Sequence, residues 1–313
     1  AHTGSAGRRL FGNLYVFLHG YPGIPQEFAD VVHHLNGGTD VWAVALPGWG
    51  RSTQLNSCAI SRVAPILAKL LLDAKDAGWE RIVLVGHDLG GLVGWRVAHE
   101  LPSGVLTSFV TFTPHPEVYF DVIRSFVADE LPFYSLLSPL KSAYLASSDF
   151  SPMLARIENE TWYDEYKQDY LRSWKQTGPR NLACYHRDNF RVVNQRAVPS
   201  EPYLYEDLHP TPHILMLGAE RDALSAKRLF LQSVNKLELI RGRLLAVRIV
   251  HNASRNTVLH NFFAHEVASE MARFDWATDM HRYGLLSALK VHPILVTPDG
   301  IEDHTIELTW LYS

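Results

Sequence analysis

Six short apolar runs along the chain constrain the fold more than any other feature of the sequence. Each is a nearly continuous stretch rich in β-forming residues, and several end at a glycine or proline. Such runs are typical of strands that are buried on both faces of a parallel sheet. The runs are Leu14–Leu18, Val41–Leu46, Arg81–Val85, Leu106–Phe112, His213–Leu217 and Leu244–Val250.

Stretches with helical spacing of apolar residues separate these runs. Ser61–Ala77 is one, and Leu92–His99, which follows two glycines, is another. Alternating strands and helices predict an α/β fold with a doubly wound, mostly parallel sheet and right-handed crossovers. The 313 residues are enough for one such domain with an insertion.

The alternation is interrupted between about Pro116 and Pro199. This stretch is rich in tyrosine, tryptophan and phenylalanine and resumes the sheet pattern at His213. We expect a helical cap (lid), residues 116–199, inserted into a core formed by residues 1–115 and 200–313. Such a cap would cover the carboxyl ends of the strands, where open α/β sheets bind ligands. Its expected helices are Val118–Asp129, Pro139–Leu145, Pro152–Arg156 and Tyr163–Lys175.

Composition excludes several classes of protein. The formal net charge is −4 and no long basic run occurs, so neither nucleic acid nor an anionic membrane is an expected partner. Cys58 and Cys184 are far apart and lack CxxC spacing, so one bridge is conceivable but reduced cysteines are the simpler expectation. No apolar run approaches the ~20 residues of a membrane span. We therefore expect a soluble cytoplasmic monomer or homodimer, with secretion after signal removal as the alternative.

The sequence GHDLGG at 86–91 directly follows the run Arg81–Val85 and precedes a helix. This is the layout of a nucleophile elbow, in which small residues allow a tight turn that presents one side chain at a helix N-terminus. The presented side chain here is Asp88, a carboxylate that can attack carbon and form an ester. A glycine-rich turn with an aspartate N-cap is the alternative. No G-x-S-x-G motif occurs, so a serine esterase lacks its main support.

Around this elbow, VGHDLGGLVGWRVAHELP resembles the nucleophile segment of the epoxide hydrolases with the α/β-hydrolase fold. HGYP at 19–22 is similar to their HGxP loop, and LPGWGRS at 46–52 to their PGxGxS turn, although Ala45 stands where aspartate is usual. The resemblance implies an oxyanion hole formed by the backbone amides of Tyr21 and Leu89. It also implies substrate contacts from the following residues. These are His19, Pro22, His87 and Trp49.

The family uses a carboxylate and a histidine to activate the water that breaks the ester. The resemblance implies Asp222 as the carboxylate, four residues after the strand HILMLG, with Glu220 as a competitor. It implies His260 as the base, ahead of Glu266 and a helix, although Leu259 stands where glycine is usual. His251, at the end of a strand, is the alternative base.

Epoxide hydrolases of this fold also use two lid tyrosines to hydrogen-bond the epoxide oxygen, a role that suits a phenol. The first of these tyrosines lies near the start of the lid in the family, and Tyr144 is the residue that matches it here. A late context similar to L-x-W-Y-R offers Tyr185, with Cys184 where tryptophan is common. The competitors could equally be packed lid aromatics. They are Tyr134, Tyr163, Tyr166 and Tyr170.

Together these residues predict a cofactor-independent and metal-independent hydrolysis of an apolar epoxide to a diol by water. A haloalkane dehalogenase is the alternative on the same fold, but Leu89 offers no side-chain donor for a halide. A non-catalytic scaffold that binds apolar ligands is the alternative from another class.

The two ends of the chain differ from the family pattern. The first β-hairpin of the family has no counterpart before His19, whereas two β runs flank PDG at 298–300. Either the hairpin has been moved to the C-terminus by circular permutation, or the C-terminal segment is an unrelated extension.

Overall fold

The computed structural model describes most of the chain. The described residues are 11–35, 39–125, 150, 163–194, 196–202, 208, 210–222, 227–237, 245–254, 257–282, 295–297 and 300–302.

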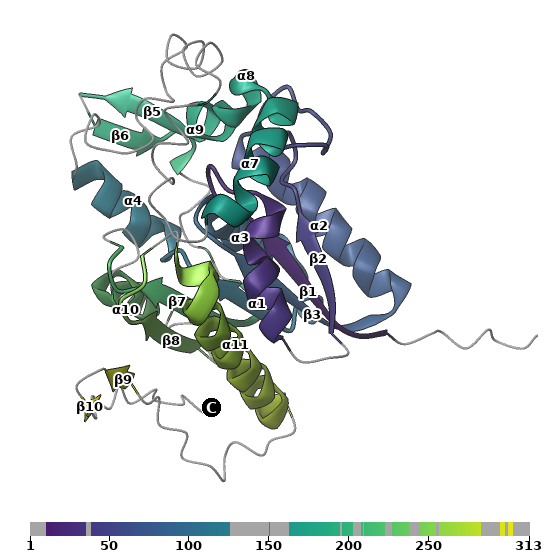
Figure 1. Cartoon of the computed structure of the whole chain (residues 1–313), viewed down its shortest axis with the longest axis vertical. Coiled ribbons are helices and arrows are strands. Elements are labelled where there is room, and N and C mark those ends of the chain that lie inside the picture. The colour runs from purple at the N-terminus through teal and green to yellow at the C-terminus, as the bar shows by residue number, and fades with distance from the viewer. Residues whose placement is uncertain are drawn as a thin grey trace, which may run out of the picture.

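A six-stranded parallel sheet forms the centre of the molecule (Figure 1). Its strand order is β2-β1-β3-β4-β7-β8, and every neighbouring pair is parallel. All six predicted strands are therefore confirmed. Their bounds are β1 Phe11–Leu18, β2 Thr39–Val44, β3 Trp79–Gly86, β4 Ser108–Thr111, β7 His213–Ala219 and β8 Leu245–Val250.

Helices cover both faces of the sheet, as the continuous apolar runs require. On β1, Leu14 and Val16 belong to one buried cluster, whereas Tyr15 and Phe17 belong to another. The first cluster packs against α2, α3 and α10, and the second against α1 and α11. Their bounds are α1 Ala29–His34, α2 Ile60–Ala77, α3 Leu89–Glu100, α10 Lys227–Leu237 and α11 Asn261–Arg282.

Between β4 and β7 the chain leaves the sheet, as the interrupted pattern predicts. Its described elements lie beyond the carboxyl ends of the strands (Figure 1). Two contacts with the loops after those strands hold them there: Trp174 Nε1 donates to the carbonyl of Pro22 at 2.8 Å, and Gly50 N donates to Thr177 Oγ1 at 2.7 Å. The elements are α4 Pro116–Ser125, α7 Tyr163–Thr177, α8 Pro179–Leu182, α9 Cys184–Asn189, β5 Phe190–Val193 and β6 Arg196–Pro199.

The C-terminal strands β9 Leu295–Thr297 and β10 Gly300–Glu302 pair antiparallel with each other. In the described part of the chain they form a sheet separate from the six-stranded one. A permuted first hairpin would instead extend the sheet at its β2 edge. The predicted hairpin is thus present, but the circular permutation is not confirmed.

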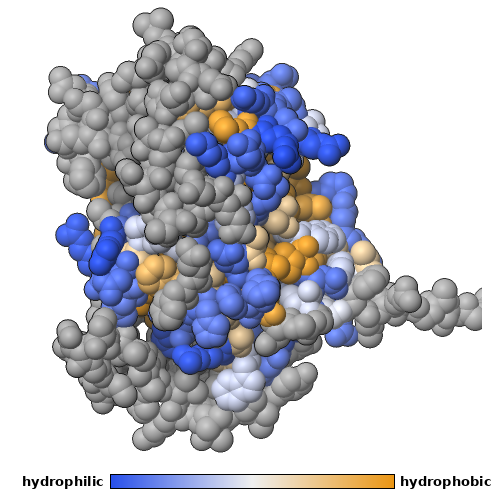
Figure 2. Space-filling view, viewed as in Figure 1, coloured by the Kyte–Doolittle hydropathy of each residue, from blue (hydrophilic) through white to orange (hydrophobic). Residues whose placement is uncertain are grey.

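The described surface in the view of Figure 2 is mostly hydrophilic, with apolar residues in small patches. Short 3-10 helices, η1 Pro25–Phe28 and η5 Thr257–Leu259, lie directly before α1 and α11. Because the six strands are parallel, the loops that follow them gather at one edge of the sheet, and the candidate site is built from those loops.

Candidate active site

Asp88 lies on a strained turn between β3 and α3. Its backbone has φ 49° and ψ −116°, a left-handed value that costs a non-glycine residue about 1–3 kcal/mol. Glycines make the turn possible, because a Cβ on Gly86 would lie 2.6 Å from the carbonyl oxygen of Gly90. A Cβ on Gly90 would lie 2.1 Å from the carbonyl oxygen of Leu18. The predicted elbow is therefore present, and it lifts the Asp88 carboxylate above the sheet edge.

The loop after β1 supplies a backbone donor to this carboxylate. Tyr21 N donates to Asp88 Oδ2 at 3.0 Å. The approach depends on Gly20, whose added Cβ would lie 2.6 Å from Asp88 Cβ. Leu89 opens α3, so its amide belongs to the helix start, where amides lack carbonyl partners within the helix. Of the two residues of the predicted oxyanion hole, Tyr21 thus contacts the carboxylate through its amide, and Leu89 directly follows Asp88 at the start of α3.

A set of neutral hydrogen bonds fixes the Asp88 backbone from the β4 side. Thr113 Oγ1 donates to the carbonyl of Asp88 at 2.8 Å. The carbonyl of Thr113 in turn accepts from Trp95 Nε1 at 3.0 Å and from Thr111 Oγ1 at 3.0 Å. Trp95 is fully buried, so this chain of bonds connects the elbow rigidly to the core.

His19 positions the oxyanion loop. Its Nδ1 lies 2.9 Å from the carbonyl of Gly20, and its Nε2 accepts from Leu46 N at 3.1 Å. Complete burial lowers the pKa of this imidazole, although the Glu27 charge opposes that change. A neutral ring is consistent with both contacts, because the Nδ1–H donates and Nε2 accepts.

Two other predicted substrate contacts belong to the same structural support. Trp49 is fully buried, with its ring centroid 5.2 Å from that of His19. The carbonyl of Pro22 accepts from Trp174. His19 thus holds the loop through Gly20, and the Trp49 ring meets the Tyr21 ring edge-on with centroids 6.0 Å apart. Contact of either ring with substrate stays a prediction.

Glu27 is an important residue that the sequence reasoning missed. It lies in η1, only 4% exposed, and its carboxylate accepts from Gly20 N and Ile24 N, each at 3.3 Å. His87 Nδ1 lies 3.3 Å from the same carboxylate. Burial alone would raise the pKa of Glu27, but the hydrogen bond and charge of His87, together with His19 and the Gly20 amide, outweigh it, and the pKa is lowered. The buried Glu27 carboxylate thus stabilises the loop that carries the Tyr21 amide.

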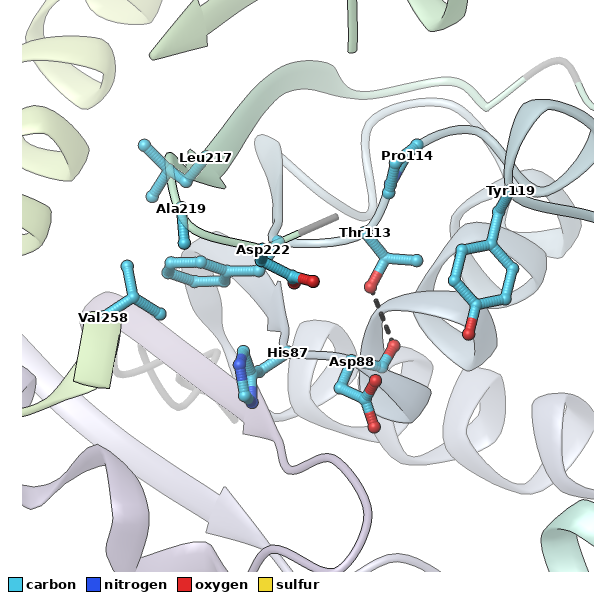
Figure 3. A pocket seen from close by; sticks show the side chains of 10 residues that line it. His87, Asp88, Thr113, Pro114, Tyr119, Leu217, Ala219, Asp222 and Val258 are labelled. Carbon is cyan, nitrogen blue, oxygen red and sulfur yellow. Dashed lines mark hydrogen bonds between the residues drawn. The ribbon is translucent and has the colours of Figure 1, made fainter. Parts of the chain in front are cut away.

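A small cavity separates Asp88 from Asp222 (Figure 3). Its volume is about 10 Å³, which is about the room that one water molecule needs. His87 and the Tyr119 ring also line it, and the two carboxylates project toward it from the ends of different strands. Tyr119, in α4, is a second residue that the sequence reasoning missed, because on a helix its phenol is indistinguishable from a packing aromatic.

The competing acid and base pair with each other at the surface. His251 Nδ1 lies 3.6 Å from Glu220 Oε1, and the Glu220 side chain is 48% exposed. Glu220 Oε2 accepts from Asn252 N at 2.7 Å, and this backbone hydrogen bond lowers the pKa of the Glu220 carboxyl. Glu220 and His251 therefore connect the loop after β7 to the loop after β8, whereas Asp222 lines the cavity.

His260 lies at the start of α11, 2% exposed, two residues after Val258, which lines the cavity. Its Nδ1 is 3.4 Å from Asp30 Oδ2, and its ring lies 5.5 Å from that of Tyr166. Burial lowers the pKa of His260, although the charges of Glu27 and Asp30 oppose that change. The imidazole is therefore kept in its proton-accepting neutral form at neutral pH. Asp30 is a partner that the sequence pattern did not indicate.

The predicted lid tyrosines have different outcomes. Tyr144 lies outside the described residues. Tyr185 is fully buried in α9, and its hydroxyl donates to the carbonyl of Pro47 at 2.8 Å. A phenol has one hydrogen to donate, and here it goes to a backbone carbonyl, so binding of the substrate oxygen by Tyr185 is not shown and stays a prediction. Tyr185 connects α9 to the loop after β2.

A disulfide makes the same connection. Cys58 and Cys184 are bonded across 126 residues, with their Cα atoms 5.5 Å apart. This overturns the expectation of two reduced cysteines, because the fold brings together residues whose sequence spacing gives no sign of a pair. Asp188 lies beside the two sulfurs, but sulfurs joined in a disulfide do not serve as thiolate ligands for a metal ion.

A doubly wound parallel sheet, with an aspartate on a strained turn at its carboxyl edge and a loop amide on its carboxylate, defines the α/β-hydrolase class. The chain belongs to the alpha/beta hydrolase family, whose model matches residues 15–273. Among the helices of the described residues, none combines the length and apolarity needed to cross a bilayer.

Comparisons with individual proteins agree with this family. The chain is 31% identical to human "Epoxide hydrolase 4" over 114 residues, which is 35% of this chain and 30% of that protein. It is 25% identical to "AB hydrolase superfamily protein YfhM" of Bacillus subtilis over 238 residues, 72% of this chain and 79% of that protein.

Solved structures show the same fold at lower identity. An epoxide hydrolase of Bacillus megaterium, solved with an inhibitor, gives a TM-score of 0.65 at 18% identity, covering 86% of this chain and 94% of that one. The structure of a putative epoxide hydrolase from Pseudomonas aeruginosa gives a TM-score of 0.66 at 17% identity, and the match covers 87% of this chain and 91% of that one.

Proposed function

We propose that this protein is an epoxide hydrolase, which converts an apolar epoxide to a vicinal diol through an ester on Asp88. The observation that carries the proposal is the contact of Tyr21 N with Asp88 Oδ2 at 3.0 Å. That amide holds one carboxylate oxygen in the oxyanion position, and the proposal assigns the attack to the other carboxylate oxygen. The strained elbow supports the same role, because it presents the carboxylate without freedom to turn away.

In the first half of the reaction, the second carboxylate oxygen of Asp88 attacks a ring carbon. A new carbon–oxygen bond forms, the ring carbon–oxygen bond breaks, and its electron pair stays on the epoxide oxygen. That oxygen takes a proton that solvent supplies and becomes the hydroxyl of a hydroxyalkyl ester. Attack by a carboxylate splits one difficult hydrolysis into two easier steps.

In the second half, water attacks the ester carbonyl of Asp88. The cavity between Asp88 and Asp222 has room for such a water. In this proposal His260 takes the proton of this water, Asp222 is the carboxylate that assists it, and the developing charge lies on the amides of Tyr21 and Leu89. The ester carbon–oxygen bond breaks, the leaving oxygen takes the second proton of the attacking water, and diol leaves. The proton held by His260 returns to solvent and replaces the one used in the first half, so that the sum is epoxide plus water to diol.

The segment 116–199 is proposed as the cap over this site, and the core as residues 1–115 and 200–313. The described cap residues contribute a group of buried aromatics beyond the strand ends, which favours an apolar substrate. These are Tyr166, Tyr170, Trp174, Tyr185 and Phe190. Several relatives are named epoxide hydrolases, and these names support an epoxide as the substrate.

The test compares diol formation from a panel of aryl and alkyl epoxides by the parent protein and by Asp88→Asn. Asp40→Asn is a matched control, because Asp40 is an exposed aspartate on β2. We expect diol from the parent and from the control, and none from Asp88→Asn. Halide release from haloalkanes is followed in parallel. Halide without diol would replace the proposal by a dehalogenase, and neither product would replace it by a ligand-binding protein.

A further inference from the structure

His186, on α9, lies against the loop that holds the nucleophile. It is 6% exposed, and its ring meets the ring of Tyr21 edge-on, with centroids 4.5 Å apart. Tyr21 is the residue whose amide holds Asp88 Oδ2. On its other side, the imidazole stacks on Phe190 at 6.0 Å. The ring is thus confined between an aromatic wall and the oxyanion loop, within the field of the Asp88 carboxylate.

The neighbours of His186 in the sequence anchor α9 to the loop between β2 and α2. Cys184 is bonded to Cys58, and the Tyr185 hydroxyl donates to Pro47. Asn189 accepts from Ile60 N at 2.7 Å and donates to the carbonyl of Cys58 at 2.8 Å. Nearly every polar or sulfur-bearing group around His186 is therefore committed to holding a helix of only six residues in place. Such an anchorage holds the His186 ring against Tyr21.

Burial lowers the pKa of His186 to about 4, although the Asp88 charge opposes that change. The ring is therefore neutral at neutral pH. A neutral imidazole carries one N–H, and it can donate a hydrogen bond to an oxygen on which charge develops.

We propose that His186, and not Tyr185, is the cap residue that donates a hydrogen bond to the epoxide oxygen when Asp88 attacks the ring. The inference rests on the proposed function and assigns a residue to its first half. The electron pair of the broken carbon–oxygen bond develops on the oxygen that faces the imidazole N–H. The hydrogen bond stabilises that alkoxide until solvent supplies the proton, so His186 begins and ends each turnover neutral.

The sequence carries a signal for this assignment that a different alignment of the same motif reveals. In the context L-x-W-Y-R, the tyrosine directly precedes the arginine. Counting back from Arg187 places His186 at the tyrosine position and Tyr185 at the tryptophan position. The structure agrees with this alignment, because the Tyr185 hydroxyl faces Pro47 whereas the His186 ring lies against Tyr21.

The test separates ester formation from ester hydrolysis in a single turnover of styrene oxide. Rapid quenching and intact-mass analysis follow the ester on Asp88, and chromatography follows the diol. His186→Leu removes the donor, His186→Gln retains an N–H donor, and Tyr185→Phe is the neighbouring control that loses only its bond to Pro47. Thermal unfolding of each variant identifies any that fail to fold.

We expect His186→Leu to form the ester roughly 100-fold more slowly or worse, and His186→Gln to recover at least about a tenth of the parental rate. Hydrolysis of the ester, once formed, changes much less in both, and Tyr185→Phe forms ester at close to the parental rate. A folded His186→Leu that forms ester at the parental rate, in a parent that makes ester and diol, overturns this inference alone. A Tyr185→Phe variant that loses ester formation while His186→Leu keeps it does the same. A parent that forms neither ester nor diol overturns the proposed function, and this inference with it.

Discussion

Replacing Gly20 by alanine adds one methyl group directly against the nucleophile. The new Cβ would lie 2.6 Å from Asp88 Cβ and 3.1 Å from Asp88 Oδ2. Carbon atoms pack at about 3.5–4.0 Å, so roughly 1 Å has to be gained by moving either the loop or the elbow. Neither moves easily: His19 and Glu27 hold the loop, and Thr113 holds the elbow.

Two magnitudes follow from this geometry. Overpacking of this kind costs about 1–3 kcal/mol of folding stability. A displacement of about 1 Å between the carboxylate and the Tyr21 amide costs on the order of 100-fold in rate. We therefore expect Gly20→Ala to fold with reduced stability and to lose most of its diol formation per folded molecule.

The assay combines urea unfolding with initial rates of diol formation from an aryl epoxide. Gly104→Ala is the control: its φ of +86° makes alanine strained by about 1–2 kcal/mol, but nothing lies within 4 Å of the added methyl. It should lose stability and keep its activity per folded molecule. Parental activity and stability in Gly20→Ala would refute the close packing of the oxyanion loop on Asp88.

Three further predictions test the supports of the site. Reducing the Cys58–Cys184 disulfide, which spans 126 residues, should lower the free energy of unfolding by roughly 2–5 kcal/mol; urea curves that coincide with and without reductant would contradict this. Glu27→Gln should lower the free energy of unfolding by about 1–3 kcal/mol, because a neutral amide cannot replace the carboxylate that accepts from two amides and faces His87. A urea midpoint equal to that of the parent would show that the Glu27–His87 pair contributes nothing to stability. The pKa of His186 is about 4 in the folded state and about 6.5 in the unfolded chain, so the unfolded chain binds the proton first as pH falls. Stability should therefore fall between about pH 6.5 and pH 4, by up to roughly 3 kcal/mol, and His186→Leu should remove this part of the pH dependence; an unchanged profile in that variant would assign the acid sensitivity to other groups.

The sheet and the elbow could be predicted because the sequence determines them locally. Each strand is a continuous apolar run, and the turn at 86–91 needs glycine at positions where any Cβ would meet backbone. The two residues that the motif indicated, Asp88 and Tyr21, meet because they lie shortly after the ends of the adjacent strands β3 and β1; their catalytic roles stay predictions. The sequence favours Asp222 over Glu220 because Glu220 comes earlier after the end of the strand. In the structure Asp222 lines the cavity, whereas the Glu220 side chain is exposed at the surface.

The supports of the site could not be predicted, because they depend on which distant segments meet. Glu27 looks like an ordinary helical glutamate until η1 is placed beneath the oxyanion loop. Cys58 and Cys184 give no sign of pairing across 126 residues. Tyr185 and His186 are adjacent on a short helix, so a shift of one position in the motif exchanges a residue that bonds the carbonyl of Pro47 for one whose ring lies against Tyr21.

The central claim, that Asp88 itself forms the ester, has a direct test in one turnover in water labelled with heavy oxygen. Excess protein reacts with less than one equivalent of epoxide, and the diol and the peptide containing Asp88 are both weighed. Because water attacks the ester carbonyl, the account predicts that the first turnover places the heavy oxygen in the Asp88 carboxylate and leaves the diol unlabelled. Label in the diol and none in Asp88 would mean that water attacks the epoxide directly, and the carboxylate would then be a base and not the nucleophile.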